Sequence, residues 1–199
     1  MIPTINGFLR KLPAWPIYIV SLVWFCWLFF LGATGRMGAE PIKELEHALG
    51  DIAIQLFIVV LAISPLRKYL GLNLIKFRRA LGLAVFFFVL THLAVWLFLD
   101  VQIWSQIWAD ILKRPYITIG MLSFVLMIPL AVTSNNRSIR KMGAGAWNNL
   151  HKLTYPAVIL GAVHNVMIQK VWEFESTFYL VVILGLLALR IKLPRRALA

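Results

Sequence analysis

The chain alternates long runs of apolar residues with short polar segments. Six such runs contain few charged side chains, and they cover approximately residues 15–31, 46–64, 80–99, 116–132, 148–168 and 176–190. An α-helix needs about 20 mostly apolar residues to cross the ~30 Å hydrocarbon core of a bilayer. Polar and apolar residues do not alternate within the runs, as they would in the strands of a membrane β-barrel. The pattern predicts an all-α membrane protein, a six-helix transmembrane bundle in which residues 1–199 form a single domain.

Basic residues are concentrated in alternate connecting segments. Fifteen of the twenty are Arg10, Lys11, Arg67, Lys68, Lys76, Arg78, Arg79, Arg137, Arg140, Lys141, Lys152, Arg190, Lys192, Arg195 and Arg196. The remaining five are Arg36, Lys43, Lys113, Arg114 and Lys170, and they share their side of the bundle with all eight acidic residues. Cytoplasmic loops carry the excess of Lys and Arg. Both termini are therefore predicted to be cytoplasmic.

Composition supports an integral membrane protein and excludes several other classes. Hydrophobic residues make up 61% of the chain and charged residues only 14%. The net charge of +12 would suit a nucleic-acid-binding protein, but the basic residues are confined to short loops, as a membrane topology requires. No cleavable signal peptide is expected, because the first apolar run is followed by further spans. Cys26 is the single cysteine, which excludes a disulfide framework, and no C-x-x-C-H motif would attach haem covalently.

The chemistry of the chain is concentrated in four histidines in or beside these runs. An imidazole within a membrane span is costly and marks a functional site by default. At ~1.5 Å of rise per residue, His92 lies about 18 Å, and His164 about 22 Å, from the inner ends of their helices. Two imidazoles at matching depths can supply both axial ligands of a haem iron. We predict this role for His92 and His164; the alternative is that each forms a hydrogen bond to a carbonyl or hydroxyl of a neighbouring helix.

The other two histidines lie nearer the membrane surfaces. His151 precedes His164 by thirteen residues, which is about 20 Å of helix and enough to serve a second, inner site. In a straight helix the two would point in different directions, but Pro156 between them can bend the helix. His47 falls in the first outer turn of its helix and is a further candidate haem ligand, with an interfacial role as the alternative. In the loop after the third run, Trp104 and Trp108 have the spacing of an amphipathic segment at the outer surface, but the favoured interpretation is the ordinary belt of aromatic residues at a membrane interface.

Several motifs along the chain occur in the order and spacing of a known family. They are Gly38–His47, Ile63–Arg67, Arg78–Leu83 followed by Thr91–Leu93, Lys113–Gly120, and Trp147-x3-His151-x3-Tyr155-x8-His164. The chain resembles the ferric-reductase-like transmembrane family over nearly its whole length, from about Gly38 to Arg190. The resemblance implies a haem-binding membrane subunit of the bacterial inner membrane, with one or two haems b. His92, His151 and His164 match haem-linked histidines of the family, and His47 matches a further one.

The resemblance also implies electron-transfer partners. Similar proteins pass electrons to MsrP, a periplasmic molybdopterin enzyme that reduces methionine sulfoxide in oxidised proteins of the cell envelope. Their electrons are described as coming from the quinone pool, and FMN and a cytosolic flavin reductase have been linked with them. Two-haem members of the family carry a second histidine where this chain has Arg78 and Arg79, so an inner haem would have His151 without an evident histidine partner. The two arginines are candidates for binding haem propionates or a flavin phosphate, and the alternative is an ordinary basic loop.

Three functions compete at this point. The first is an electron-transfer subunit, in which the partner carries out the sulfoxide chemistry. The second is a stand-alone ferric or cupric metalloreductase, and the third is a small transporter with histidine proton relays. No G-x-G-x-x-G motif follows a strand, so no dinucleotide-binding domain is expected in this chain. The inner halves of the spans contain no acidic residue, which is unlike a proton-coupled transporter. These observations favour the electron-transfer subunit.

Overall fold

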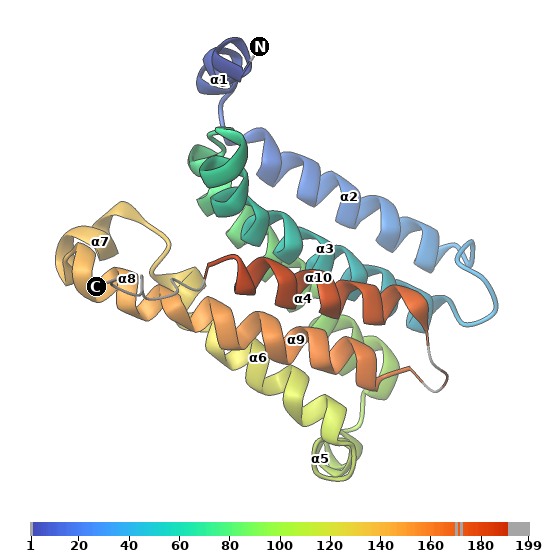
Figure 1. Cartoon of the computed structure of the whole chain (residues 1–199). Helices are drawn as coiled ribbons and strands as arrows, with labels where there is room; N and C mark the ends of the chain where they lie inside the picture. The colour runs from blue at the N-terminus through green and yellow to red at the C-terminus, as the bar shows by residue number, and fades with distance from the viewer. Residues whose placement is uncertain (1, 170, 172, 191–199) are drawn as a thin grey trace.

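The computed structural model describes residues 2–169, 171 and 173–190, and this part of the chain is helical without strands. Six longer helices form a bundle (Figure 1): α2 (Pro16–Ala33), α3 (Pro41–Leu70), α4 (Arg78–Val95), α6 (Pro115–Val132), α9 (Thr154–Met167) and α10 (Phe174–Ala188). Helix α3 packs on α4, α6 packs on α9, and α10 contacts both α3 and α9. Of the basic residues used for the topology prediction, Lys170, Lys192, Arg195 and Arg196 lie outside the described residues.

Four helical segments are long and apolar enough to cross a membrane. They are Pro16–Ala33, Pro41–Leu70, Ile75–Val101 and Pro115–Val132, and the apolar helix Phe174–Ala188 is shorter. Each of the six predicted runs contains a helix, and the chain is a multi-pass membrane protein. The count of six spans and the cytoplasmic side of the termini stay predictions.

Helix α3 is longer at both ends than the predicted 46–64. It begins with Pro41 in its first turn and continues through Pro65 to Leu70, where Gly71 ends it at φ 69°. Proline has no N–H, so a helix that continues through Pro65 leaves the carbonyl of Leu61, one turn earlier, without its usual donor. The guanidinium of Arg190 donates a hydrogen bond to this carbonyl. Pro65 is tolerated because a side chain from the other end of the sequence replaces the missing donor.

Two of the runs change helical geometry near a histidine. Helix α4 ends at Val95 and continues as a π-helical segment, Trp96–Val101, after which Gln102 has φ 58°. The fifth run consists of α8 (Ala144–Leu150), a 3₁₀ turn (His151–Leu153) and α9. Pro156 lies in the first turn of α9, where its missing N–H is tolerated. The helical geometry therefore changes at His151–Leu153, three residues before Pro156, and Pro156 itself lies within α9.

A short helix that the apolar runs did not predict, α1 (Ile2–Lys11), precedes the bundle. Its Asn6 donates to the carbonyl of Gly71 and accepts from the backbone N–H of Asn73, both at 2.9 Å. These bonds hold α1 at the α3–α4 connection, which is also the end of the bundle where Arg190 contacts Leu61. The two ends of the described chain therefore lie at the same end of the bundle (Figure 1).

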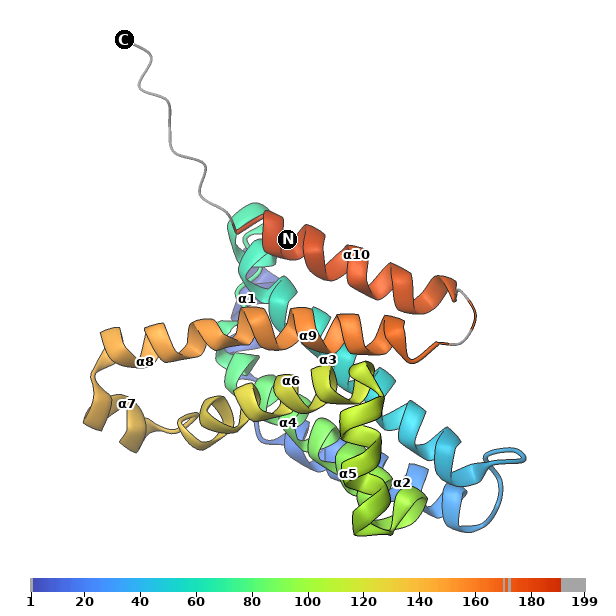
Figure 2. The same ribbon diagram turned by 90° about the horizontal axis from the view of Figure 1, so that it is seen from below.

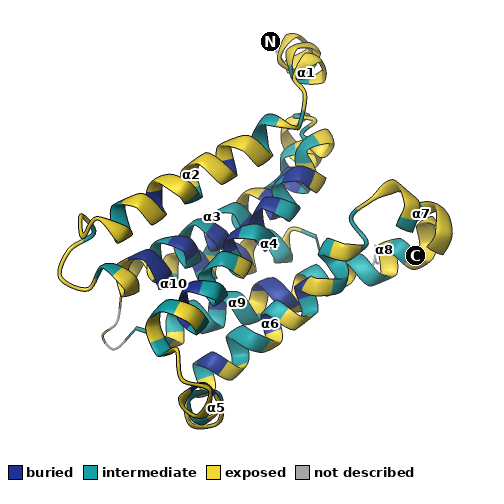
Figure 3. Cartoon of the chain, turned by 180° about the vertical axis from the view of Figure 1, so that it is seen from behind, coloured by how far each residue is buried: buried dark blue, intermediate teal, exposed yellow. Residues whose placement is uncertain are grey.

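The core lies between α3, α4, α9 and α10. Its largest fully buried side chains are Phe88, Leu49, Leu61, Ile63, Ile183, Val85 and Val158. Figure 3 shows that α2 is mostly exposed, and its exposed side chains include Trp24 and Trp27, as expected of a face that meets lipid. The segment with Trp104 and Trp108 forms helix α5 (Trp104–Lys113), which runs across one end of the bundle (Figure 2), so the amphipathic segment, the less favoured interpretation of the sequence, is present. Ile107 of α5 is buried, whereas the two tryptophans are exposed.

Candidate functional site: a cavity with two facing histidines

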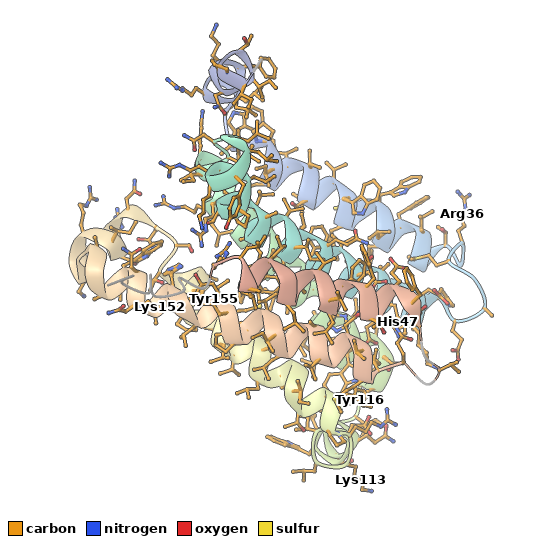
Figure 4. All side chains as sticks on the ribbon, viewed as in Figure 1. Arg36, His47, Lys113, Tyr116, Lys152 and Tyr155 are labelled. Atoms are coloured by element: carbon orange, nitrogen blue, oxygen red, sulfur yellow. The ribbon has the colours of Figure 1, made fainter. Side chains whose placement is uncertain are left out.

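A cavity of about 1340 Å³ opens at the end of the bundle opposite α1. Helices α3, α4, α6 and α9 supply its walls, while α5 and the start of α10 contribute to its rim. His47, His92 and His164 all line it, from three different helices. Figure 4 labels His47 and Tyr116 at this end, and Lys152 and Tyr155 at the other. The cavity is large enough for a bulky planar cofactor.

His92 is held in a defined orientation by the backbone of α3. Its Nδ1 lies 2.8 Å from the carbonyl oxygen of Glu46. A carbonyl can only accept, so Nδ1 carries the proton and donates, and Nε2 keeps its lone pair. Among the described residues no hydrogen bond reaches this Nε2. The ring is therefore fixed in the tautomer in which Nε2 is the nitrogen that has a lone pair for a metal ion.

His164 is held in the same way by the backbone of α6. Its Nδ1 donates to the carbonyl oxygen of Tyr116 at 2.8 Å. Its Nε2 likewise has no hydrogen-bond partner within the described part of the chain. The sequence left open whether these histidines bind a cofactor or a neighbouring carbonyl. The structure shows that the carbonyl bond uses one nitrogen only, so the two roles are compatible.

A glycine makes each of these two hydrogen bonds sterically feasible. Gly50 follows Glu46 by four residues, and Gly120 follows Tyr116 by four. A Cβ added at Gly50 would lie 3.3 Å from Nδ1 of His92, and one at Gly120 would lie 2.8 Å from Nδ1 of His164. Each ring occupies the space that a side chain one turn further along the helix would need.

The two histidine rings lie close to each other across the cavity. Their centroids are 6.2 Å apart and their planes meet at 77°. A transition metal binds an imidazole nitrogen at about 2.0–2.1 Å, so two rings on opposite sides of one metal ion have centres roughly 6 Å apart. The observed separation and the two lone-pair nitrogens fit a single iron held between His92 and His164. The matched depth inferred from the sequence thus corresponds to a real juxtaposition, while the role of the pair as ligands stays a prediction.

The mouth of this cavity is strongly acidic. All eight acidic residues of the sequence line it, and they are Glu40, Glu44, Glu46, Asp51, Asp100, Asp110, Glu173 and Glu175. Two cations, Lys43 and Arg114, line it as well. The hydrogen bond from Arg114 to the hydroxyl of Tyr116 raises the pKa of Arg114. His47 is exposed at the mouth.

His151 lies apart from this cavity, near the other end of the bundle. Its Nε2 is 3.1 Å from Oγ1 of Thr133, and its ring stacks on Trp147 with centroids 3.7 Å apart. The Thr133 hydroxyl already donates to the carbonyl of Pro129, so Nε2 of His151 is the donor and Nδ1 keeps its lone pair. Arg78 and Arg79 lie near His151 and are not part of the cavity lining. The structure thus separates the pair His92 and His164, at one end of the bundle, from His151 and the two arginines near the other end.

Several of the residues that shape the site were not predicted from the sequence. The two carbonyls that hold the histidines, those of Glu46 and Tyr116, could not be predicted from the sequence, because every residue has a carbonyl. Gly120 gave a usable signal because it ends the motif Lys113–Gly120, and glycine inside an apolar helix often marks a close approach. Gly50 gave the weaker signal of a glycine in a span.

Comparison with known proteins places this geometry in a family. The family described as "Ferric reductase like transmembrane component" matches residues 48–162, more than half of the chain. A protein-methionine-sulfoxide reductase heme-binding subunit, MsrQ, of Brucella anthropi is 45% identical over 181 residues, which cover 90% of this chain and 82% of that protein. Subunits of the same name from Brucella ovis and Brucella suis are each 44% identical over the same shares of both chains.

The fold, the facing histidines and the match to residues 48–162 define a membrane protein of the ferric-reductase-like transmembrane class. Within this class, the chain belongs to the family of protein-methionine-sulfoxide reductase heme-binding subunits, MsrQ. This agrees with the resemblance noted from the sequence motifs.

Proposed function

We propose that this chain is a membrane b-type cytochrome subunit. It passes electrons from the quinone pool or a flavin donor across the bacterial inner membrane to the periplasmic methionine sulfoxide reductase MsrP, for the repair of oxidised periplasmic proteins. The observation that carries the proposal is the pair His92 and His164, whose rings are 6.2 Å apart with both Nε2 atoms free of hydrogen bonds among the described residues. The printed name of the relatives, heme-binding subunits, supports the same cofactor.

In this function His92 and His164 hold the iron through Nε2. Haem, when bound, supplies an iron that gains and loses one electron. The bonds from Nδ1 to the carbonyls of Glu46 and Tyr116 orient both imidazoles and increase their basicity. Apolar lining residues such as Phe57 and Phe124 exclude water from the inner part of the cavity. The protein therefore positions the cofactor and sets its potential, and the sulfoxide chemistry belongs to the partner.

The two ends of the bundle suit different roles in this scheme. At the end with the cavity lie all of the acidic residues, and we assign it to the periplasm, where MsrP docks. The end with His151, Arg78 and Arg79 is basic, and we assign it to the cytoplasm. His151 with its arginines is the candidate site for a second haem or for the phosphate of FMN.

Haem content is the first test. The chain is expressed with haem precursor, purified in mild detergent, and examined by reduced-minus-oxidised spectra with haem quantified per polypeptide. The chain should show low-spin b-type bands, which His92→Ala and His164→Ala should abolish. Full haem content in both variants would overturn the ligand assignment. Comparison of His151→Ala with His47→Ala then shows whether either residue serves a haem of its own.

The electron acceptor separates the proposal from a metalloreductase. Reconstituted vesicles that contain the holoprotein, a reduced quinol and purified MsrP should convert methionine sulfoxide to methionine. Reduction of a ferric chelate by the same vesicles without MsrP, at a rate equal to or above that of sulfoxide reduction, would favour the metalloreductase instead.

A further inference from the structure

The cavity that the two histidines face has an unusual charge distribution. Its lining contains every acidic residue of the sequence but, among the residues that the structure describes, only two permanent cations, Lys43 and Arg114. An anionic group that entered this cavity would be repelled over most of the mouth and attracted at these two positions alone. The remaining cations of the outer segments that the structure describes, Arg36 and Lys113, are absent from the lining.

Lys43 and Arg114 occupy corresponding places relative to the two histidines. Lys43 lies three residues before Glu46, whose carbonyl holds His92. Arg114 lies two residues before Tyr116, whose carbonyl holds His164. Each histidine is therefore fixed by a segment that also carries one cation at the cavity mouth.

Both cations are oriented by an acidic neighbour and keep donors for another partner. Nζ of Lys43 lies 2.8 Å from Oε1 of Glu40, which occupies one of the three N–H groups of the ammonium. Nε of Arg114 lies 3.2 Å from Oδ1 of Asp110, and its Nη1 donates to the Tyr116 hydroxyl at 3.3 Å. A guanidinium has five N–H groups, so a planar carboxylate can still bind to it.

We propose that Lys43 and Arg114 bind the two propionate groups of the haem whose iron His92 and His164 hold. This inference rests on the proposed function. A carboxylate that is partly removed from water requires a charged hydrogen-bond partner, and no other permanent cation lines this cavity in the described part of the chain. Arg78 and Arg79, which the sequence offered for propionates, are near His151 and remain candidates for the inner site only.

The test compares cations on the lining with cations beside it. Lys43→Gln and Arg114→Gln each remove one positive charge from the cavity lining. The matched controls Arg36→Gln and Lys113→Gln each remove one positive charge from the same end of the bundle but outside the lining (Figure 4). The midpoint potential of each purified holoprotein is titrated, and the rate of haem transfer to apomyoglobin is measured.

Loss of a cation beside a propionate disfavours the added electron. At a fixed potential the ratio of reduced to oxidised haem should fall at least threefold in each lining variant, which is about 28 mV at 59 mV per tenfold change for one electron. Haem should also leave each lining variant at least three times faster than it leaves the controls. Arg114→Lys, which keeps the charge, should restore most of the wild-type potential.

The outcomes distinguish the inference from the function on which it rests. If the wild-type chain binds no haem, the proposed function fails. If haem binds through His92 and His164 but the lining variants match their controls in potential and haem release, the propionate assignment is wrong and the function stands. If Arg114→Gln does not accumulate, Lys43→Gln and Arg114→Lys decide the assignment by the same two measurements.

Discussion

Gly120 lies against the imidazole of His164, so close that a methyl group in place of its hydrogen would come within 2.8 Å of Nδ1. The same relationship, at 3.3 Å, joins Gly50 to His92. In both cases the glycine lies one turn after the residue whose carbonyl accepts a hydrogen bond from Nδ1 of the histidine. A helix can offer a backbone carbonyl to a ring on a neighbouring helix only where the next turn leaves room. Two glycines therefore determine how both candidate ligands are oriented.

Gly120→Ala should displace His164 and lower haem content. A contact of 2.8 Å is too short for a Cβ, so the ring must move away from the Tyr116 carbonyl or the α6–α9 pair must separate. Gly50→Ala, at 3.3 Å, should have a smaller effect in the same direction. Haem per polypeptide, measured after purification, reports the change.

Gly82 and Gly185 supply the matched controls, because a Cβ at either position meets nothing within 4 Å. Alanine there should leave haem content unchanged and stabilise the helix by about 0.5–1 kcal/mol. If Gly120→Ala held as much haem as Gly82→Ala, the steric argument for the orientation of His164 would be wrong.

Ser123→Ala should weaken the contact between α6 and α9. Ser123 is only 5% exposed, and its hydroxyl donates to the carbonyl of Ala157 at 2.8 Å. Interhelical hydrogen bonds in membranes contribute about 0.6 kcal/mol on average. The loss should be of this size, measured as the free energy of unfolding in a detergent titration. Ser134→Ala is the control, since its hydroxyl donates to the carbonyl of Leu130 in the last turn of the helix that precedes it, makes no bond between helices, and should cost less.

Arg190→Leu should destabilise the bundle by leaving the carbonyl of Leu61 without a donor. Pro65 has removed the helical partner of this carbonyl, and Arg190 replaces it. A buried polar group without a partner costs about 1–3 kcal/mol. Thermal unfolding of the purified protein, compared with the exposed-arginine variant Arg67→Leu, measures the loss.

A double-mutant cycle tests the explanation itself. Pro65→Ala returns an N–H to the helix and gives the Leu61 carbonyl its ordinary donor. Arg190→Leu should therefore cost less in a Pro65→Ala background than in the wild type. Equal costs in the two backgrounds would show that Arg190 stabilises the bundle for another reason, such as its contact with Tyr155.

The sequence predicted the helices and the histidine pair for physical reasons that are local. Apolar runs determine which segments become helices, and a constant rise per residue places His92 and His164 at similar depths. The extent of α3 could not be predicted in this way. Its continuation through Pro65 depends on Arg190, which lies 129 residues from Leu61 in the sequence. The lining cations Lys43 and Arg114 were counted only as topology signals, because charge placement does not show which cations line a cavity.

Helix α1 was missed although its sequence carried a signal. Ile2, Ile5 and Phe8 recur at intervals of three, and Leu12 follows after four, which is the spacing of one helical face. A search restricted to long apolar runs passes over a short amphipathic helix. The structure also shows what holds α1 in place, namely the side chain of Asn6 and the ammonium of Lys76, which donates to the carbonyl of Arg10 at 2.7 Å.

Asn6→Ala should therefore release α1 from the bundle without disturbing the membrane helices. The amide of Asn6 forms two hydrogen bonds, one to the carbonyl of Gly71 and one from the N–H of Asn73, each contributing about 0.5–1.5 kcal/mol. Asn6→Asp keeps the acceptor but loses the donor, so its effect should be intermediate. Amide hydrogen exchange of residues 2–11 in detergent micelles measures the release, and Thr4→Ala is the control on the same helix. Exchange as slow in Asn6→Ala as in Thr4→Ala would mean that α1 is held by other contacts, such as the bond from Lys76 to the carbonyl of Arg10, and that the paired amide bonds contribute little to its position.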